Sequence, residues 1–105
     1  MFISKGNNVT TLINVFSVKP ENQEKLLKLW IEFTEDLKSE PGLLGASLHK
    51  SQDGTRVINY AQWRSDGDFD AFRNKYGPRF AALAAVSEVV DPHTYDIVYQ
   101  YERES

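Results

Sequence analysis

The strongest constraint on the fold is a β-hairpin signal in the middle of the chain. Residues 43–51 and 56–63 both have strand-like sequences, and Gln-Asp-Gly-Thr at residues 52–55 separates them. An Asp-Gly pair between two such runs is among the strongest short-range signals for a hairpin. The centre of the chain is therefore expected to form two adjacent antiparallel strands.

A strand and a helix are expected before this hairpin. Residues 9–18 are rich in β-branched residues and fit no helical stripe, which predicts a strand. Pro20 and the acidic residues after it are typical of a first helical turn. Apolar side chains then recur at helical spacing until a Pro-Gly pair at residues 41–42 ends the helix.

A second helix and a last strand are expected after the hairpin. Ser65 is a typical N-cap residue, with an acidic residue three positions later. A Gly-Pro pair should interrupt this helix before residues 79–86 resume it. An Asp-Pro pair at residues 91–92 is expected to end the helical region, and the alternation over residues 94–101 predicts the final strand.

The predicted order is β-α-β-β-α-β, the ferredoxin-like α+β arrangement. Its sheet is antiparallel with both helices on one face, and strand alternation assigns an apolar set to the open face. That set comprises Ile13, Val15, Ile58, Tyr60 and Val98. An apolar face of this size usually meets a partner, so two sheets packed face to face would form a dimeric α/β-barrel with twofold symmetry.

Composition narrows the function classes. The 105 residues fit one domain, expected over residues 9–105 after a flexible N-terminal arm at residues 1–8. The net charge of −3, with basic residues scattered among acidic ones, argues against nucleic acid as a partner. The N-terminus lacks the apolar core of a signal peptide and no run could span a bilayer, so a cytoplasmic location without membrane binding is expected.

Metal and nucleotide sites are not indicated. The chain has no cysteine, which removes disulfides, thiolate metal ligands and a cysteine nucleophile. Its two histidines, His49 and His93, are far apart and lack metal-ligand spacing, and no glycine-rich phosphate loop is present. No cofactor is therefore expected.

Polar groups on two strands indicate a pocket between sheet and helices. Asn59 and Trp63 share one face of the third strand, and Asn14 has a similar position on the first. A buried amide is costly without partners, and an indole supplies one N–H donor. An apolar cavity with a few such groups is typical of a small-molecule site. Further predicted lining residues are Trp30, Phe33, Phe69, Phe72 and Tyr76.

Two alternatives to this pocket stay open at the level of residue spacing. Asn59 could be a structural amide, and the aromatic residues could be core alone. His49 lies one hairpin away from Asn59, and imidazole is a common acid–base group in proteins. His49 is therefore a candidate base or hydrogen-bond partner, or else a structural strand residue.

Residues 53–65, Asp-Gly-Thr-Arg-Val-Ile-Asn-Tyr-Ala-Gln-Trp-Arg-Ser, resemble the antibiotic biosynthesis monooxygenase family, most closely the quinone-forming monooxygenases of aromatic polyketide pathways. The resemblance implies a homodimer of ferredoxin-like subunits. It also implies oxidation of an electron-rich phenol, anthrone or hydroquinone to a quinone by O2, without flavin, heme or metal. The family's Asn and Trp correspond to Asn59 and Trp63, which are implied to stabilise the substrate anion.

One position departs from the polyketide enzymes. They carry a tyrosine where this chain has Phe69, which cannot donate or accept a proton. Proton handling would then fall to His49 or Tyr76, or be absent. The expected catalytic set is accordingly Asn59, Trp63 and His49.

Other readings of the same resemblance remain. Asn14 matches an asparagine of the heme-degrading branch, whereas Phe72 and Ala82 stand approximately where that branch has a tryptophan and a histidine. The alternatives are a heme-binding, heme-degrading or isomerase-like enzyme on this scaffold, and a non-enzymatic dimer that binds a small molecule.

Overall fold

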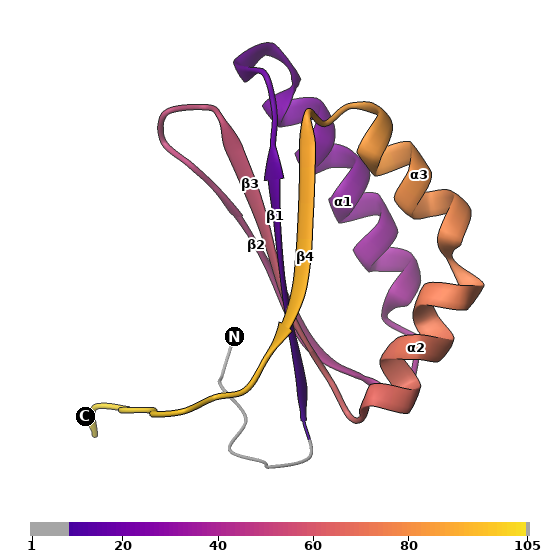
Figure 1. Cartoon of the computed structure of the whole chain (residues 1–105), viewed down its shortest axis with the longest axis vertical. Coiled ribbons are helices and arrows are strands. Elements are labelled where there is room, and N and C mark those ends of the chain that lie inside the picture. Colours follow the sequence, from indigo (N-terminus) through magenta and orange to yellow (C-terminus); the bar gives the residue numbers. More distant parts are fainter. Residues whose placement is uncertain (1–8, 105) are drawn as a thin grey trace.

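The computed structural model describes residues 9–104 as a four-stranded antiparallel sheet with its α-helices on one face (Figure 1). The elements are β1 (Thr10–Ser17), a 3-10 turn η1 (Pro20–Asn22), α1 (Gln23–Leu37), β2 (Leu43–Lys50), β3 (Arg56–Trp63), α2 (Asp66–Lys75), α3 (Gly77–Ala85) and β4 (Val89–Tyr95). The strand order is β2-β3-β1-β4. This confirms the ferredoxin-like α+β fold, while the arm expected at residues 1–8 lies outside the described residues.

The predicted hairpin is present between β2 and β3. Gly54 has a φ of 82°, a left-handed conformation that glycine adopts without steric cost. The register of β3 with β1 then places Asn59 directly opposite Asn14 and Ala61 opposite Leu12. These four residues share the helix-facing side of the sheet, as the alternation predicted.

The position of the last strand was predicted wrongly. It was expected over residues 94–101, but β4 ends at Tyr95 and contains Pro92, which the sequence placed at a break. Pro92 is tolerated because β4 is an edge strand whose only partner is β1, so its missing N–H need not break the ladder. Val98 follows the strand, is 95% exposed and is not part of the sheet face.

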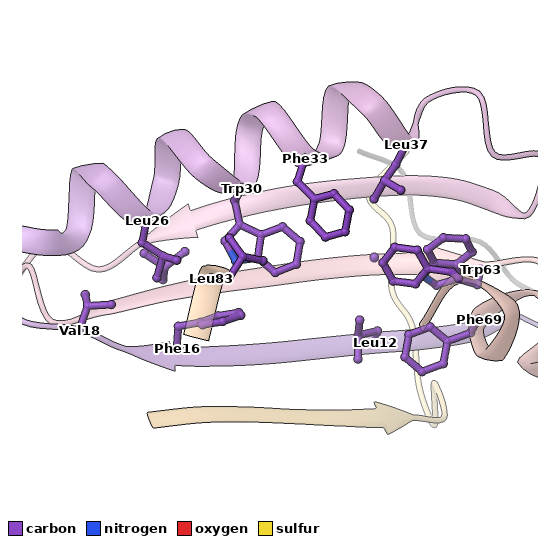
Figure 2. Packing of buried hydrophobic residues seen from close by; sticks show 13 residues of the cluster. Leu12, Phe16, Val18, Leu26, Trp30, Phe33, Leu37, Trp63, Phe69 and Leu83 are labelled. Atoms are coloured by element: carbon purple, nitrogen blue, oxygen red, sulfur yellow. The ribbon is translucent and has the colours of Figure 1, made fainter. Parts of the chain in front are cut away.

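Helix α1 supplies much of the core. Its apolar stripe points to the sheet, and Figure 2 shows Trp30, Phe33 and Leu37 directed from the helix toward the strands. The buried hydrophobic core consists of Leu12, Phe16, Val18, Leu26, Trp30, Phe33, Leu37, Val57, Ala61, Trp63, Phe69, Phe72 and Leu83.

The second helical region is divided into two pieces, as predicted. Ser65 caps α2, and its hydroxyl accepts a hydrogen bond from the Asp68 N–H at 3.1 Å. The chain leaves helical geometry at Tyr76, and α3 starts at Gly77, two residues earlier than expected. Within residues 9–104 no helix is long and apolar enough to cross a membrane.

Candidate functional site

A cavity of about 350 Å³ lies between the sheet and the second helical region. Strands β1 and β4 form one wall, and α2 and α3 form the other. Its lining consists of Leu12, Asn14, Phe16, Phe69, Arg73, Phe80, Ala81, Ala84, Val90 and Pro92. The volume and the largely apolar walls fit a flat aromatic ligand of modest size.

Asn14 is the buried polar group of this cavity. Its side chain is 3% exposed, and its Oδ1 has no hydrogen-bond partner among residues 9–104. A buried acceptor without a partner costs about 1–3 kcal/mol. A buried group of this kind calls for an explanation, and a ligand that donates to Oδ1 is one, so Asn14 makes the cavity a candidate binding site.

A second, much smaller cavity of about 10 Å³ adjoins the first, and Leu12 lines both. Asn59, Trp63 and Trp30 line this small cavity. The indole N–H groups of Trp30 and Trp63 are buried and lack acceptors within the described part of the chain. Asn59 lies across the ladder from Asn14, so the polar residues of the two cavities come from neighbouring positions of the sheet.

Stacked rings hold Trp63 in place. The centroids of Trp63 and Phe72 are 4.5 Å apart with nearly parallel planes, and Phe69 lies 6.2 Å from Trp63. Figure 2 shows Leu12, Trp63 and Phe69 gathered at the same end of the sheet. This packing fixes the orientation of the indole, whose N–H has no acceptor within the described part of the chain.

Comparison with known proteins assigns the chain to a family. The profile of the family described as "Antibiotic biosynthesis monooxygenase" matches residues 10–86. The chain is 49% identical over 88 residues to tetracenomycin-F1 monooxygenase of Streptomyces glaucescens, covering 81% of this chain and 79% of that protein. The protein belongs to the antibiotic biosynthesis monooxygenase family.

Solved structures agree with this assignment. A monooxygenase from the ActVA-Orf6 gene of Streptomyces coelicolor, in complex with Nanaomycin D, has a TM-score of 0.75 and 29% identity, covering 92% of this chain and 94% of that chain. SnoaB of Streptomyces nogalater, a cofactor-independent oxygenase, has a TM-score of 0.77 over 91% of this chain and 99% of its own. At 17% identity, SnoaB supports the fold alone.

The residues expected to form the site are only partly brought together. Asn14 and Phe69 line the larger cavity, whereas Asn59, Trp63, Trp30 and Phe72 line the smaller one. Phe33 and Tyr76 line neither cavity. The sequence centred the pocket on Asn59 and Trp63, but the larger space lies one strand further along, toward β4.

Tyr76 is engaged elsewhere. Its hydroxyl donates a 2.6 Å hydrogen bond to Glu40 Oε1, which raises the pKa of Tyr76. The same bond, with a second from Lys75, lowers the pKa of Glu40. A tyrosine held in this way is a poor proton donor for a ligand in the larger cavity.

His49 lies on the opposite face of the sheet from Asn59. It pairs across the ladder with Ile58, is exposed, and its ring is 2.9 Å from the hydroxyl of Ser47. Within one chain His49 therefore does not reach the helix-side cavities. Its proposed part in proton handling stays a prediction that would require a route other than direct contact.

Of the ten residues that line the larger cavity, the sequence prediction included only Asn14 and Phe69. Val90 and Pro92 were not recognised because the last strand was placed too late. Phe80 and Ala84 repeat at helical spacing on α3, a signal that could have found them. Arg73 gave no such signal, since a basic residue near a helix end is usually a solvated one.

The described residues form no evident binding site for a metal or heme. Within residues 9–104 no group of three or more His, Cys, Asp and Glu side chains is placed to bind a metal ion. No histidine, tyrosine, cysteine or methionine is among the residues that line the two cavities, so neither cavity offers a side chain of the kind that usually binds heme iron. The heme-degrading reading does not fit this site.

Proposed function

We propose that this protein is a cofactor-independent monooxygenase that oxidises an electron-rich phenol, anthrone or hydroquinone to a quinone with O2. One observation carries the proposal. Three buried polar atoms without partners, Asn14 Oδ1, Trp30 Nε1 and Trp63 Nε1, surround adjoining apolar cavities in a chain of this family. The 49% identity to tetracenomycin-F1 monooxygenase supports the reaction class.

The chemistry suits a site made of apolar walls and fixed dipoles. Ground-state O2 is a triplet and reacts slowly with closed-shell molecules, but a phenolate or enolate can donate an electron to it. With an anthrone, the methylene carbon loses both hydrogens, one oxygen atom becomes the new carbonyl and the other leaves as water. The substrate supplies all four electrons, so no external reductant is needed.

The protein's part is to bind the ring system and favour its anion. Trp63 and Asn59 are proposed to donate to the developing oxyanion, where preorganised donors in a dry site act most strongly. Asn14 is proposed to orient the substrate from the wall of the larger cavity. The stacked aromatic rings beside Trp63 are proposed to limit the access of water to the oxyanion.

Oxygen uptake with an anthrone or a naphthol, without added cofactor, tests the proposal. The double variant Asn59→Ala/Trp63→Phe should lower kcat by about tenfold or more, because each lost donor is worth about 1 kcal/mol or more. Asn74→Ala, which changes an exposed asparagine of α2, is the control and should keep full activity. Undiminished uptake in the double variant would contradict the assigned roles.

The His49 prediction is tested in the same assay. If His49→Ala loses activity while its fold is intact, the histidine acts on the reaction from the far face of the sheet. Full activity would remove His49 from the catalytic set. Hemin titration provides a further check, since tight binding with a Soret shift would favour the heme-binding alternative over the monooxygenase.

We also propose a homodimer formed through the open sheet face. Ile13, Val15, Ile58 and Tyr60 occupy that face at intermediate exposure. The segment after β4 extends away from the sheet (Figure 1), and its Val98, Tyr99 and Tyr101 are 95%, 84% and 70% exposed. Such apolar surface usually packs against another chain. Light scattering behind size-exclusion chromatography should give twice the chain mass, and a monomer would contradict this part.

We also propose that the protein is located in the cytoplasm. A chain without cysteine has no disulfide framework of the kind that many small secreted domains need. Fractionation of cells that produce the protein would test the location, and recovery outside the cytoplasm would contradict it.

A further inference from the structure

Among the described residues that line the larger cavity, Arg73 is the one that carries a charge. Every other lining residue is apolar except Asn14, which is buried. The guanidinium group carries five N–H donors, and the ion pair with Asp70 uses Nη2 at 2.5 Å from Oδ1. Arg73 therefore has donors to spare for an acceptor that occupies the cavity.

The cavity is polar at two separate places. Arg73 comes from α2 and its side chain is 58% exposed, so it lies at the mouth. Asn14 comes from β1, on the opposite wall, and is 3% exposed. Phe69 lies beneath the guanidinium at 5.0 Å and forms part of the apolar wall between them.

Comparison with Arg79 shows that packing alone does not place an arginine at this cavity. Arg79 pairs with Asp36 at 2.9 Å and covers the ring of Phe33 at 4.7 Å, much as Arg73 pairs with Asp70 and covers Phe69. Arg79 nevertheless lines neither of the two cavities described above. The chain thus contains two arginines in equivalent settings, of which one borders the proposed site.

We propose that the substrate of this site is an aromatic acid. Its ring system fills the apolar space, a phenolic hydroxyl at one end donates to Asn14 Oδ1, and a carboxylate or second acidic oxygen at the other end binds Arg73. Arginine suits this role because its planar fork matches a carboxylate with two parallel hydrogen bonds. The choice of ring system rests on the proposed function. The preference for an anion can be measured by binding alone, without turnover.

Asp70 sets the strength of this selection. Its carboxylate already neutralises part of the Arg73 charge, so an incoming anion must share the guanidinium with it. Removing that charge with Asp70→Asn should tighten binding of an anionic ligand and leave a neutral ligand unaffected. Because both groups are well exposed, added salt should reduce the preference for the anion.

The test measures equilibrium binding by calorimetry rather than turnover. The probes are a hydroxynaphthoate, with its hydroxyl and carboxylate on opposite rings, and the methyl ester of the same compound. The wild-type protein should bind the acid about tenfold more tightly than the ester, a difference of about 1.4 kcal/mol. Arg73→Ala should remove this preference, Arg73→Lys should keep part of it, and Arg79→Ala should keep it fully.

Two results would overturn the inference: equal affinity for acid and ester in the wild-type protein, or an unchanged preference in Arg73→Ala. Circular dichroism of each variant confirms that the fold is intact. Retained anion selection with no oxygen uptake would refute the monooxygenase proposal and leave this inference standing. Oxygen uptake without anion selection would refute this inference and leave the monooxygenase proposal standing.

Discussion

Replacing Asn14 by leucine should stabilise the ligand-free protein and at the same time impair its activity. Oδ1 of Asn14 is buried without a partner, and a buried acceptor in this state costs about 1–3 kcal/mol. Leucine is close to asparagine in size and adds no polar atom, so most of that cost should disappear. A stabilisation of about 1 kcal/mol corresponds to a rise in Tm of about 4–8 °C for a domain of this length.

Gln23→Leu is the matched control, because it changes a buried amide whose hydrogen bonds are made. Nε2 of Gln23 donates to the carbonyl oxygens of Ser51 at 3.1 Å and Arg56 at 3.0 Å. Losing both bonds should destabilise the protein by about 1–3 kcal/mol. The two substitutions are thus expected to shift stability in opposite directions although their chemistry is alike.

Thermal unfolding followed by circular dichroism measures both variants, and urea titration gives the free energies. Oxygen uptake by Asn14→Leu should fall well below that of the wild-type protein. If Asn14→Leu is destabilised as strongly as Gln23→Leu, the Asn14 acceptor is satisfied in the folded protein. The interpretation of Asn14 as a group held ready for a ligand would then be refuted.

Three further predictions concern the elements that position the site. Ser65→Ala removes the hydroxyl that accepts from the Asp68 N–H and should cost about 0.5–2 kcal/mol in urea unfolding; no loss would mean that the cap is not needed. Gly54→Ala, at a φ of 82°, should cost about 1–2 kcal/mol in the same measurement, and a neutral result would contradict the strain expected at that turn. Hydrogen bonds from Thr55 and its neighbours lower the pKa of Asp53 from 3.8 to about 2, so its contribution is present above pH 3.8 and lost as the pH falls toward 2. Asp53→Asn should therefore flatten the pH dependence of stability in that window, and an unchanged slope would contradict the assignment.

The sheet could be predicted because its residues carry strong local signals. Strand β3 was predicted with its observed bounds, and the faces of β1 and β3 follow directly from period-two alternation. The placement of Asn14 and Asn59 on one face followed from the same rule. Their position directly opposite each other depends on strand register, which a single strand's sequence does not specify.

The location of the larger cavity could not be predicted in the same way. Its outer wall is β4, where Pro92 looked like a break because proline is excluded from the interior of a sheet. Only the strand order shows that β4 is an edge, where proline is allowed. Without that strand, the polar groups appeared to converge on Asn59 and Trp63, and the space beside Asn14 was not apparent.

The character of the two cavities has a consequence for how a reaction could begin here. Oxidation by O2 requires the substrate anion, yet among residues 9–104 those that line the two cavities include no carboxylate, histidine or tyrosine that could remove a proton. Phe69 has no hydroxyl at the position where the family resemblance implies a tyrosine, and Tyr76 is bound to Glu40. The anion must then be favoured by stabilisation rather than produced by a base at the site. In the proposed roles, Arg73 at the mouth and the indole N–H of Trp63 would both act in that direction, because a positive charge or a hydrogen-bond donor lowers the pKa of an acidic group placed beside it. A substrate that is already acidic, such as a hydroxylated aromatic acid, is the kind of molecule that this arrangement would oxidise without a catalytic base.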